Sequence, residues 1–366
     1  MLRTARLQDK EELKALWDLC FDEEPDFLEW FFERRFMPAY CVVFERDGRI
    51  IGCAHSIPFH IKIRSQILPC AIISGVSTHP DYRRQGVAGQ VMRFLMHTLR
   101  GYGIVLTPHR PQRLETYFPI GHYPVSDSLY VQEDAAHACT SDDYAELVDI
   151  RENAELLYVC YQRFAQRYSG IIHRSYADFL FKCEDYLSCD AKCLLYKDGG
   201  VPEAYCIFFE TPQEVNGEEL VACSKNAYAH IYTSMRRYAA GKAYVLRAAG
   251  DAPLPEFSAE AEVLPRGVMG LANASLLLSA LGLQGFSLEI TDAAVPENAG
   301  IYTLSGQKTM QPPQLRMEAG RLVQWAVGYR SINEIIAAGD AELLDEAILA
   351  PMETLAPCPC FIFDEY

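Results

Sequence analysis

Apolar positions in the first part of the chain follow a helical period and then the pattern of strands. Residues 7–21 place Leu7, Leu13, Leu16 and Trp17 at helical spacing, which predicts a helix. The apolar runs that follow are bounded by turn residues, and Asp47-Gly48 between two of them is typical of a tight hairpin. The pattern therefore predicts a helix and then a meander of strands at 40–46, 50–57, 59–64 and 66–78.

A loop and an amphipathic helix follow this meander. Residues 71–78 are rich in Ile and Val and stop at the turn signal Pro80-Asp81. Apolar residues from Val87 to Leu99 then form one stripe at helical spacing, and the stripe stops at Gly101. Beyond this helix we expect a strand at 103–107, a short helix near 112–118 and a strand near 128–132.

The rest of the chain divides into two further units. From residue 133 the pattern predicts helices near 156–164, 175–181 and 226–240, and strands at 191–196, 204–209 and 243–247, which repeats the order of the first unit. Residues 250–265 are rich in Pro, Ala and Glu and mark the next boundary. Beyond it we expect helices at 268–281, 331–337 and 340–349, with strands near 286–291, 300–304 and 321–327. We predict three units: residues 1–132, 133–256 and 262–366.

The loop before the first-unit helix has the composition of an anion site. Gly86 and the small Ala88 let the backbone approach a bulky group, and free N–H groups at the start of a helix point toward it. The Gly-Lys-Ser/Thr ending of a Walker loop is absent, and so is the three-glycine spacing of a dinucleotide site. The sequence therefore indicates a different phosphate loop, with an ordinary basic helix start as the alternative.

Composition narrows the class of protein. The chain has 366 residues, 50% of them hydrophobic and 22% charged, which predicts packed globular domains. The formal net charge of -16 argues against general binding to nucleic acid or anionic membranes and favours cationic ligands, including amines. The 13 cysteines include no Cys-x-x-Cys pair, so we expect reduced thiols and no metal site. The start of the chain lacks the apolar run of a signal peptide, and residues 268–283 are too short and polar to span a bilayer, so a cytoplasmic enzyme is expected.

The loop also carries a family resemblance. Arg83, Gly86 and Ala88 fill the pattern Arg/Gln-x-x-Gly-x-Gly/Ala, and Val76-x-Thr78 precedes them. This combination resembles the acetyl-CoA loop of the GNAT N-acetyltransferase superfamily. With three units in this order, the whole chain resembles the enhanced intracellular survival (Eis) family, which joins two GNAT-like domains to a sterol-carrier-like domain. The resemblance implies this α/β (α+β) architecture, with tandem GNAT folds before the sterol-carrier-like domain. It also implies acetyl transfer from acetyl-CoA to amines and a homo-oligomer, which in that family is a hexamer.

The resemblance also assigns roles in a site for acetyl-CoA. Backbone groups of Val76, Ser77 and Thr78 would pair with the pantetheine arm and the thioester carbonyl. The residues that would hold the pyrophosphate are Arg83, Arg84, Gln85, Gly86, Val87, Ala88 and Gly89. For the two arginines, a solvated helix start is the alternative.

The general acid implied by the resemblance is Tyr117. The stretch from Tyr117 to His122 resembles the family's Tyr-x-x-x-Gly-aromatic turn, although His122 departs from the usual aromatic residue. A phenol has a reference pKa of about 10, so it is protonated at neutral pH and can donate to the departing CoA thiolate. Two alternatives stay open: Tyr117 packs under the loop, or Tyr123 takes the role.

The general base implied by the resemblance is the carboxylate at the end of the chain, which here would be that of Tyr366. Burial or the neighbouring Asp364 and Glu365 would have to raise its pKa for this role. A frayed tail is the alternative. The apolar tail residues Phe361, Ile362 and Phe363 argue against that alternative.

These observations predict an acetyl-CoA-dependent N-acetyltransferase. Its small-molecule acceptor is an amine that is aminoglycoside-like, polyamine-like or lysine-like, and residues of the second unit are expected to contribute to its pocket. The alternative is a protein without catalysis, either an acyl-CoA sensor or a lipid-binding protein that works through the third unit.

Overall fold

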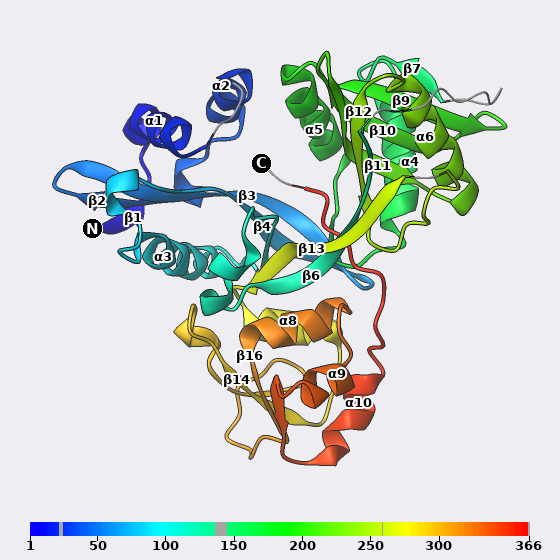
Figure 1. The fold of residues 1–366 in the computed structure, drawn as a ribbon. Helices are drawn as coiled ribbons and strands as arrows, with labels where there is room; N and C mark the ends of the chain where they lie inside the picture. Colours follow the sequence, from blue (N-terminus) through cyan, green and yellow to red (C-terminus); the bar gives the residue numbers. More distant parts are fainter. Residues whose placement is uncertain (22–24, 135, 137–144, 258, 365–366) are drawn as a thin grey trace.

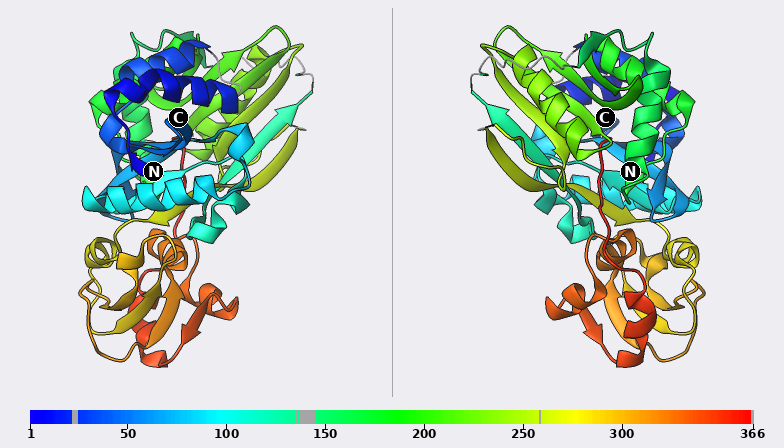
Figure 2. Two further views of the ribbon diagram at one scale, coloured as in Figure 1. Left: turned by 90° about the vertical axis from the view of Figure 1, so that its left-hand side faces the viewer. Right: turned by 90° about the vertical axis from the view of Figure 1, so that its right-hand side faces the viewer.

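The computed structural model describes residues 1–21, 25–134, 136, 145–257 and 259–364 (Figure 1). One large sheet runs through the first two units, and a four-stranded sheet builds the third (Figures 1 and 2). We keep the names first, second and third unit for the predicted ranges. The strand order in the large sheet is β1-β2-β3-β4-β5-β13-β6-β12-β11-β10-β9-β7, with β8 pairing with β3.

The first unit consists of six strands and three helices: β1 (Leu2–Thr4), α1 (Lys10–Cys20), α2 (Pro25–Arg34), β2 (Cys41–Arg46), β3 (Arg49–Ile63), β4 (Gln66–Thr78), α3 (Val87–Gly101), β5 (Leu106–His109) and β6 (Tyr123–Glu133). Its strands alternate between two buried faces. In β2, Cys41 and Val43 belong to the cluster that contains α1 and α2, whereas Val42 belongs to the cluster of α3. The helices therefore cover opposite faces of the sheet (Figure 1).

The second unit repeats this plan. Its elements are β7 (Glu146–Val148), α4 (Ala154–Ala165), β8 (Ile171–Ile172), α5 (Tyr176–Ser188), β9 (Lys192–Asp198), β10 (Val201–Glu210), β11 (Glu214–Ala222), α6 (Lys225–Tyr238) and β12 (Ala243–Ala249). Cys206 and Phe208 face α6, whereas Tyr205 and Ile207 face α4 and α5. In both units a helix joins two strands that pair in parallel, β4 with β5 and β11 with β12.

The third unit lies below the large sheet in Figure 1. Its first strand, β13 (Glu260–Leu271), begins two residues before the predicted boundary and lies between β5 and β6 in the large sheet. Its own elements are α7 (Ala274–Leu281), β14 (Ser287–Thr291), β15 (Gly300–Thr303), β16 (Leu315–Glu318), α8 (Ala319–Val327), α9 (Ile332–Ala337), β17 (Ala341–Leu343) and α10 (Leu349–Glu353). Helix α8 packs against β6 and β13, so the third unit is joined to the sheet that carries the first.

The tip of the β3–β4 hairpin joins all three units. Lys62 Nζ donates to the carbonyl of Gln166 at 2.7 Å and to those of Ala165 and Tyr168 at 3.1 Å, just past the end of α4. Arg64 donates to the carbonyls of Ala326 in α8 and of Ala356, at 2.9 and 2.7 Å. Cations at helix C-termini stabilise the unpaired carbonyls there. The hairpin tip therefore fixes the second and third units to the first.

The first unit contains the predicted helix, meander of strands, helix and strands in that order, with several differences in detail. Asp47 and Gly48 adopt positive φ values of 52° and 76° and form the predicted hairpin turn. The predicted strands 50–57 and 59–64 are one strand, β3, and the predicted helix near 112–118 is a pair of short 3-10 turns at Leu114–Thr116 and Phe118–Ile120. Helix α2 and the strands β1, β7, β8, β11 and β16 were not predicted.

Three predictions in the third unit are wrong in part. Residues 321–327, predicted as a strand, belong to α8, a helix of only 9 residues whose short apolar run is hard to distinguish from a buried strand. The predicted helix 268–281 is the end of β13 followed by α7. The predicted helix 340–349 is strand β17, a 3-10 turn at Glu346–Ile348 and the start of α10.

Candidate active site

Strands β4 and β5 separate soon after they meet. They pair in parallel at one position, Cys70 with Leu106. Further along β4 the register against β3 shifts, because Gly75 and Val76 together face Ala54. Beyond this bulge, β4 keeps its pairing with β3 on one side, as between Ser77 and Cys53. Its opposite edge faces the gap between the two strands, where backbone groups can bind an extended ligand.

Gly75 allows the bulge to form. Its φ of 53° lies in the left-handed region, and a Cβ at this position would lie 2.3 Å from the Trp17 ring of α1. Trp17 is buried among aromatic rings, with the Phe31 ring centroid 4.6 Å away. The wall behind the bulge is therefore rigid and tightly packed.

The loop after β4 ends at a helix start that carries no side-chain cap. Arg84 and Gly86 adopt φ values of 62° and 73°, and Gly86 is the N-cap of α3. The first N–H groups of a helix have no partner within it, and no side chain of the described residues caps α3. Arg83 and Gln85 hold the loop through bonds to the carbonyls of Thr78 and Asp81, at 3.3 and 3.2 Å. This exposed helix start has the form of an anion site.

A cavity of about 880 Å³ lies next to the bulge, between the first and second units. Ile73, Ser74, Gly75 and Val76 of β4 line one side, and Phe27 of α2 lines another. The second unit contributes residues from α5, such as Asp185 and Tyr186, and from β10 and β11, such as Glu210 and Glu218. Contacts between α2 and α5 bridge the two units, including a bond of 2.9 Å from Arg34 to Glu184. The cavity and the helix start are linked by the open edge of β4.

The structure separates the two candidate tyrosines. Tyr117 lines the cavity, and burial raises its pKa to about 12, so the phenol is protonated at neutral pH. The Tyr123 hydroxyl instead donates to Glu318 at 2.7 Å, at the junction with the third unit. The turn between them is held by the third unit, since a Cβ on Gly320 would lie 2.1 Å from the Gly121 carbonyl oxygen. Tyr117 is therefore the tyrosine placed to act on a ligand in the cavity.

Carboxylates outnumber cations on the cavity wall, where the cations are Arg110, Arg113 and Lys182. The carboxylates that line it are Asp26, Asp185, Asp190, Glu210 and Glu218. Asp185 accepts a bond from Lys182 at 2.5 Å, and Glu218 pairs with Arg247. Hydrogen bonds from Lys192 and then Lys242 and Tyr238 lower the pKa of Glu210 to about 2. Asp26 and Asp190 are exposed and have no ion-pair partner in the described part of the chain, so they can bind an added cation.

The C-terminal tail runs from the third unit into the space between the first two (Figure 1). The backbone N–H of Ser169 donates to the Pro359 carbonyl at 2.8 Å, and the N–H of Phe361 donates to the Ser169 carbonyl at 3.1 Å. The backbone N–H of Ile362 donates to Ser126 Oγ at 3.0 Å. Phe361 and Phe363 join the buried cluster of α4 and α5. The tail is therefore packed as part of the core up to Asp364.

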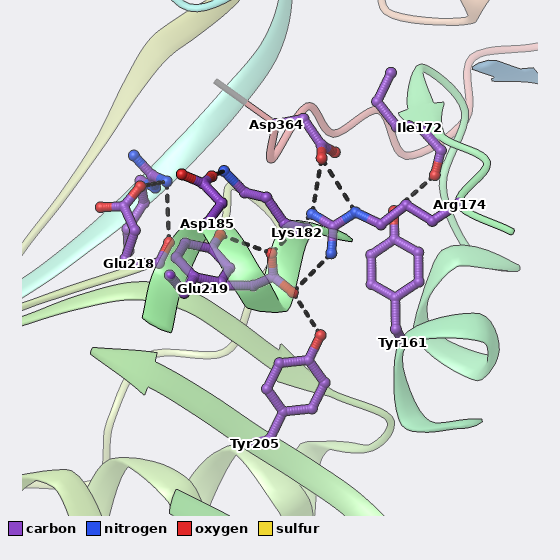
Figure 3. Close-up of polar contacts among 11 residues, drawn as sticks. Tyr161, Ile172, Arg174, Lys182, Asp185, Tyr205, Glu218, Glu219 and Asp364 are labelled. Atoms are coloured by element: carbon purple, nitrogen blue, oxygen red, sulfur yellow. Dashed lines mark hydrogen bonds and ion pairs between the residues drawn. The ribbon is translucent and has the colours of Figure 1, made fainter. Parts of the chain in front are cut away.

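Asp364 is held by a buried cluster of charges (Figure 3). Arg174 Nη2 and Nε donate to Asp364 Oδ1 at 2.9 and 3.1 Å, and two further bonds of 2.8 and 2.9 Å bind Arg174 to Glu219. Glu219 also accepts bonds from the hydroxyls of Tyr186 and Tyr205. Burial raises the pKa of Asp364 against the effect of Arg174, and the Asp364 carboxylate in turn helps to raise the pKa of Cys70, at the point where β4 meets β5. The last described residue of the tail is thus fixed by Arg174 of the second unit.

The structure brings together most of the predicted residues. Val76 lines the cavity, and Ser77 and Thr78 continue β4 toward the loop of residues 83–89. Tyr366 lies outside the described residues. Sequence reasoning missed Asp26, Asp190 and His109, which also line the cavity. His109 is the last residue of β5, but no sequence signal indicates that it faces Tyr117.

The described residues contain neither a candidate metal site nor a candidate membrane-spanning helix. No group of three or more His, Cys, Asp or Glu side chains there is arranged to hold a metal ion. Likewise, no described helix is both long and apolar enough to cross a membrane.

Comparisons with known proteins agree with this geometry. Residues 1–123 match the family described as the acetyltransferase (GNAT) domain, and residues 275–359 match the sterol carrier protein domain. The chain thus carries a GNAT acetyltransferase domain at its start and a sterol-carrier-like domain near its end. No curated protein matches the chain.

Solved structures share the fold over the whole chain. A probable N-acyltransferase from Enterococcus faecalis is 18% identical with a TM-score of 0.80, covering 100% of this chain and 99% of its own. A GCN5-related N-acetyltransferase from Anabaena variabilis is 18% identical with a TM-score of 0.80, covering 100% of both chains. Eis1 from Mycobacterium abscessus is 15% identical with a TM-score of 0.76, also covering 100% of both chains. The predicted architecture, GNAT folds followed by a sterol-carrier-like domain, is therefore confirmed.

Proposed function

We propose that this protein is an acetyl-CoA-dependent N-acetyltransferase that acetylates primary amines. The observation that carries the proposal is the continuous path from the uncapped start of α3, along the open edge of β4, to Tyr117 in the acidic cavity. The GNAT match over residues 1–123 supports it. Each part of the path suits one part of the two substrates.

The loop and strand would bind acetyl-CoA. Backbone N–H groups of residues 84–89 would hold the pyrophosphate, where the helix dipole favours a negative charge. Val76, Ser77 and Thr78 would pair with the pantetheine arm along the open edge of β4. This arrangement directs the thioester toward the cavity and Tyr117.

The chemistry requires one proton donor and one proton acceptor. The amine nitrogen attacks the thioester carbonyl carbon, a C–N bond forms and the C–S bond breaks. Tyr117 donates its phenolic proton to the CoA thiolate, a role supported by its protonated state at neutral pH. The proton lost by the amine would go to the Tyr366 carboxylate, and the support for this role is the fixed position of Asp364 two residues earlier.

The cavity favours a cationic acceptor. Asp26 and Asp190 are exposed carboxylates on elements of different units and would attract ammonium groups. An acceptor with several amines, such as a polyamine or an aminoglycoside, could place one amine at the thioester and another at a carboxylate.

The test is thiol release from acetyl-CoA with a panel of monoamines, polyamines and aminoglycosides, after a thermal-shift titration with acetyl-CoA. We expect stabilisation by acetyl-CoA and amine-dependent thiol release. Stabilisation without release for any amine would favour an acyl-CoA sensor. An unchanged melting temperature together with no thiol release would contradict both the N-acetyltransferase and the acyl-CoA sensor.

The base is tested separately by deleting Tyr366 and, in a second variant, by adding two glycines after it. Both changes displace the carboxylate while leaving Asp364 in place. We expect the turnover number to fall with acetyl-CoA binding intact. Full rates in both variants would exclude the chain end as the base.

A further inference from the structure

Two buried histidines beside Tyr117 have polar atoms that the fold does not use. His109 is 3% exposed and His122 is 0% exposed. Neither nitrogen of either ring has a hydrogen-bond partner in the described part of the chain. Buried polar side chains are almost always bonded, so an unpartnered pair requires an explanation.

The two histidines differ in their access to the cavity. His109 is the last residue of β5, pairs with Val268 of β13 and lines the cavity. Its ring centroid lies 4.6 Å from that of Tyr117 in an edge-on arrangement and 5.1 Å from that of His122. His122 is enclosed behind it against Gly270, where a Cβ would lie 2.0 Å from His122 Nε2. His109 therefore borders the cavity, with His122 behind it, while both of its ring nitrogens are buried. A 180° flip of the ring exchanges nitrogen and carbon positions and would present an N–H to a ligand in the cavity.

The surroundings keep His109 neutral. Burial lowers its pKa to about 3, and the Thr107 backbone opposes this shift without reaching hydrogen-bond geometry. Burial, and then His109 itself, lowers the pKa of His122. A neutral imidazole offers one N–H donor and one acceptor. Taking a proton from an ammonium group with a pKa of about 10 would be unfavourable by roughly 10⁷-fold. The donor is thus the useful group.

We propose that His109 is a catalytic residue that donates its ring N–H to the carbonyl oxygen of the bound acyl thioester, where negative charge develops during attack. This inference rests on the proposed function, because it needs an acyl thioester in the cavity. Tyr117 protonates the sulfur, while His109, whose ring contacts that of Tyr117, stabilises the oxygen. His122 orients His109 by packing against it and needs no bond to the ligand.

Four variants test this role. His109→Leu removes the donor, whereas His109→Asn and His109→Gln place an amide N–H near the former Nδ1 and Nε2. We expect the turnover number of His109→Leu to fall about 100-fold, the usual cost of losing one such donor. One of the two amide variants should recover at least about tenfold of that loss. His97→Leu, the matched control at a histidine that pairs with Glu297 outside the cavity, should stay within about threefold of the wild type.

Two further readouts separate this role from a structural role or a base. Acetyl-CoA binding by calorimetry should change less than threefold in His109→Leu, because the bond strengthens only as charge develops. The pH profile of kcat/KM should keep its shape in the active amide variant. In ¹⁵N-histidine spectra, one resonance that His109→Leu removes should shift when acetyl-CoA is added to the wild type.

The outcomes separate failure of this inference from failure of the proposed function. If the wild type releases no thiol with any amine, the proposed function fails, and an unmoved His109 resonance then also contradicts the contact. If the wild type turns over and His109→Leu keeps its rate, only the inference fails. Loss of the acidic limb of the pH profile in the amide variants would mark His109 as the base and overturn the donor role.

Discussion

The first and second units build the same strand, helix and strand, yet the two helix starts differ. In the first unit, residues 79–86 separate β4 from α3, and the N-cap Gly86 has no side chain to offer. In the second, α6 begins three residues after β11 ends, and Ser224 Oγ accepts a bond from the Ala227 N–H at 3.1 Å. Only the first helix start is left free for a ligand, so the site depends on the loop and not on the topology.

The two parallel strand pairs differ in the same way. Both β4 and β11 carry a bulge, at Gly75 to Val76 and at Glu218. Up to and at its bulge, β4 borders the cavity. Beyond its bulge, β11 carries Glu219, which Arg174, two tyrosines and the tail residue Asp364 enclose. One copy of the plan therefore leaves room for substrates, while the other anchors the tail.

The largest expected effect is the loss of turnover when Tyr117, the proposed general acid, is replaced. Tyr117→Phe removes the proton donor, and general acid catalysis contributes about 10² to 10⁴ in rate. We expect the turnover number to fall within that range while acetyl-CoA binding, measured by calorimetry, is retained. Tyr123→Phe is the matched control, since Tyr123 bonds to Glu318, and it should cost less than about tenfold. A full rate in Tyr117→Phe would remove this residue from the mechanism.

The second-largest expected effect is a loss of stability when Arg174, which holds the tail residue Asp364, is replaced. Arg174→Leu would leave Glu219 and Asp364 as buried carboxylates without their cation, a change that costs about 3 to 5 kcal/mol of stability. Denaturant unfolding measures it. The matched control, Arg163→Leu, breaks the more exposed pair with Glu203 and should cost less than about 1 kcal/mol. Equal stability in both variants would mean that the buried cluster does not hold the tail.

The third prediction exchanges the properties of the two helix starts. Gly86→Val places a branched residue at a φ of 73°, which costs about 1 to 2 kcal/mol and displaces the loop, so acetyl-CoA should bind at least about tenfold more weakly. Ser224→Ala removes the cap of α6 at a cost of about 1 kcal/mol in stability. Its acetyl-CoA affinity and one-site stoichiometry in calorimetry should not change. A second acetyl-CoA site in Ser224→Ala would contradict the conclusion that the loop, and not the topology, makes the first helix start a binding site.

The smallest expected effect is on the binding of the amine acceptor, measured as its KM. Asp26→Asn and Asp190→Asn each remove one exposed carboxylate, and such pairs contribute about 0.2 to 1 kcal/mol. We expect KM for a polyamine to rise about 1.5- to 5-fold in each variant, with little change in the turnover number. The effect should shrink at high salt and for a monoamine. A rise of the same size for a monoamine would mean that these carboxylates do not bind a second ammonium group.

The sequence predicted the elements whose signals are local. The Asp47-Gly48 turn and the Gly86 loop are short motifs whose residues fix the backbone themselves. Helix α8 was missed because it has only 9 residues, and a short, mostly buried apolar run is hard to assign to a helix or a strand. The start of the predicted helix at 268–281 was wrong because Val268 to Leu271 continue β13, a central strand buried on both faces.

The site was predictable to a similar degree. The uncapped loop before α3 follows from its motif, but the approach of His109 to Tyr117 arises only when the turn after β5 folds back. The acidic wall combines α2 with α5 and β10, which are more than a hundred residues apart in the chain. Such long-range contacts leave no pattern in one sequence.

The most direct test of the central claim is hydrogen exchange of the wild-type protein with and without acetyl-CoA. The account predicts slower exchange in peptides that cover residues 76–78 and 84–89, because their N–H groups would bind the ligand. Peptides that cover residues 222–227 at the start of α6 should not change. Protection at α6, or saturating acetyl-CoA without protection at residues 84–89, would contradict the account.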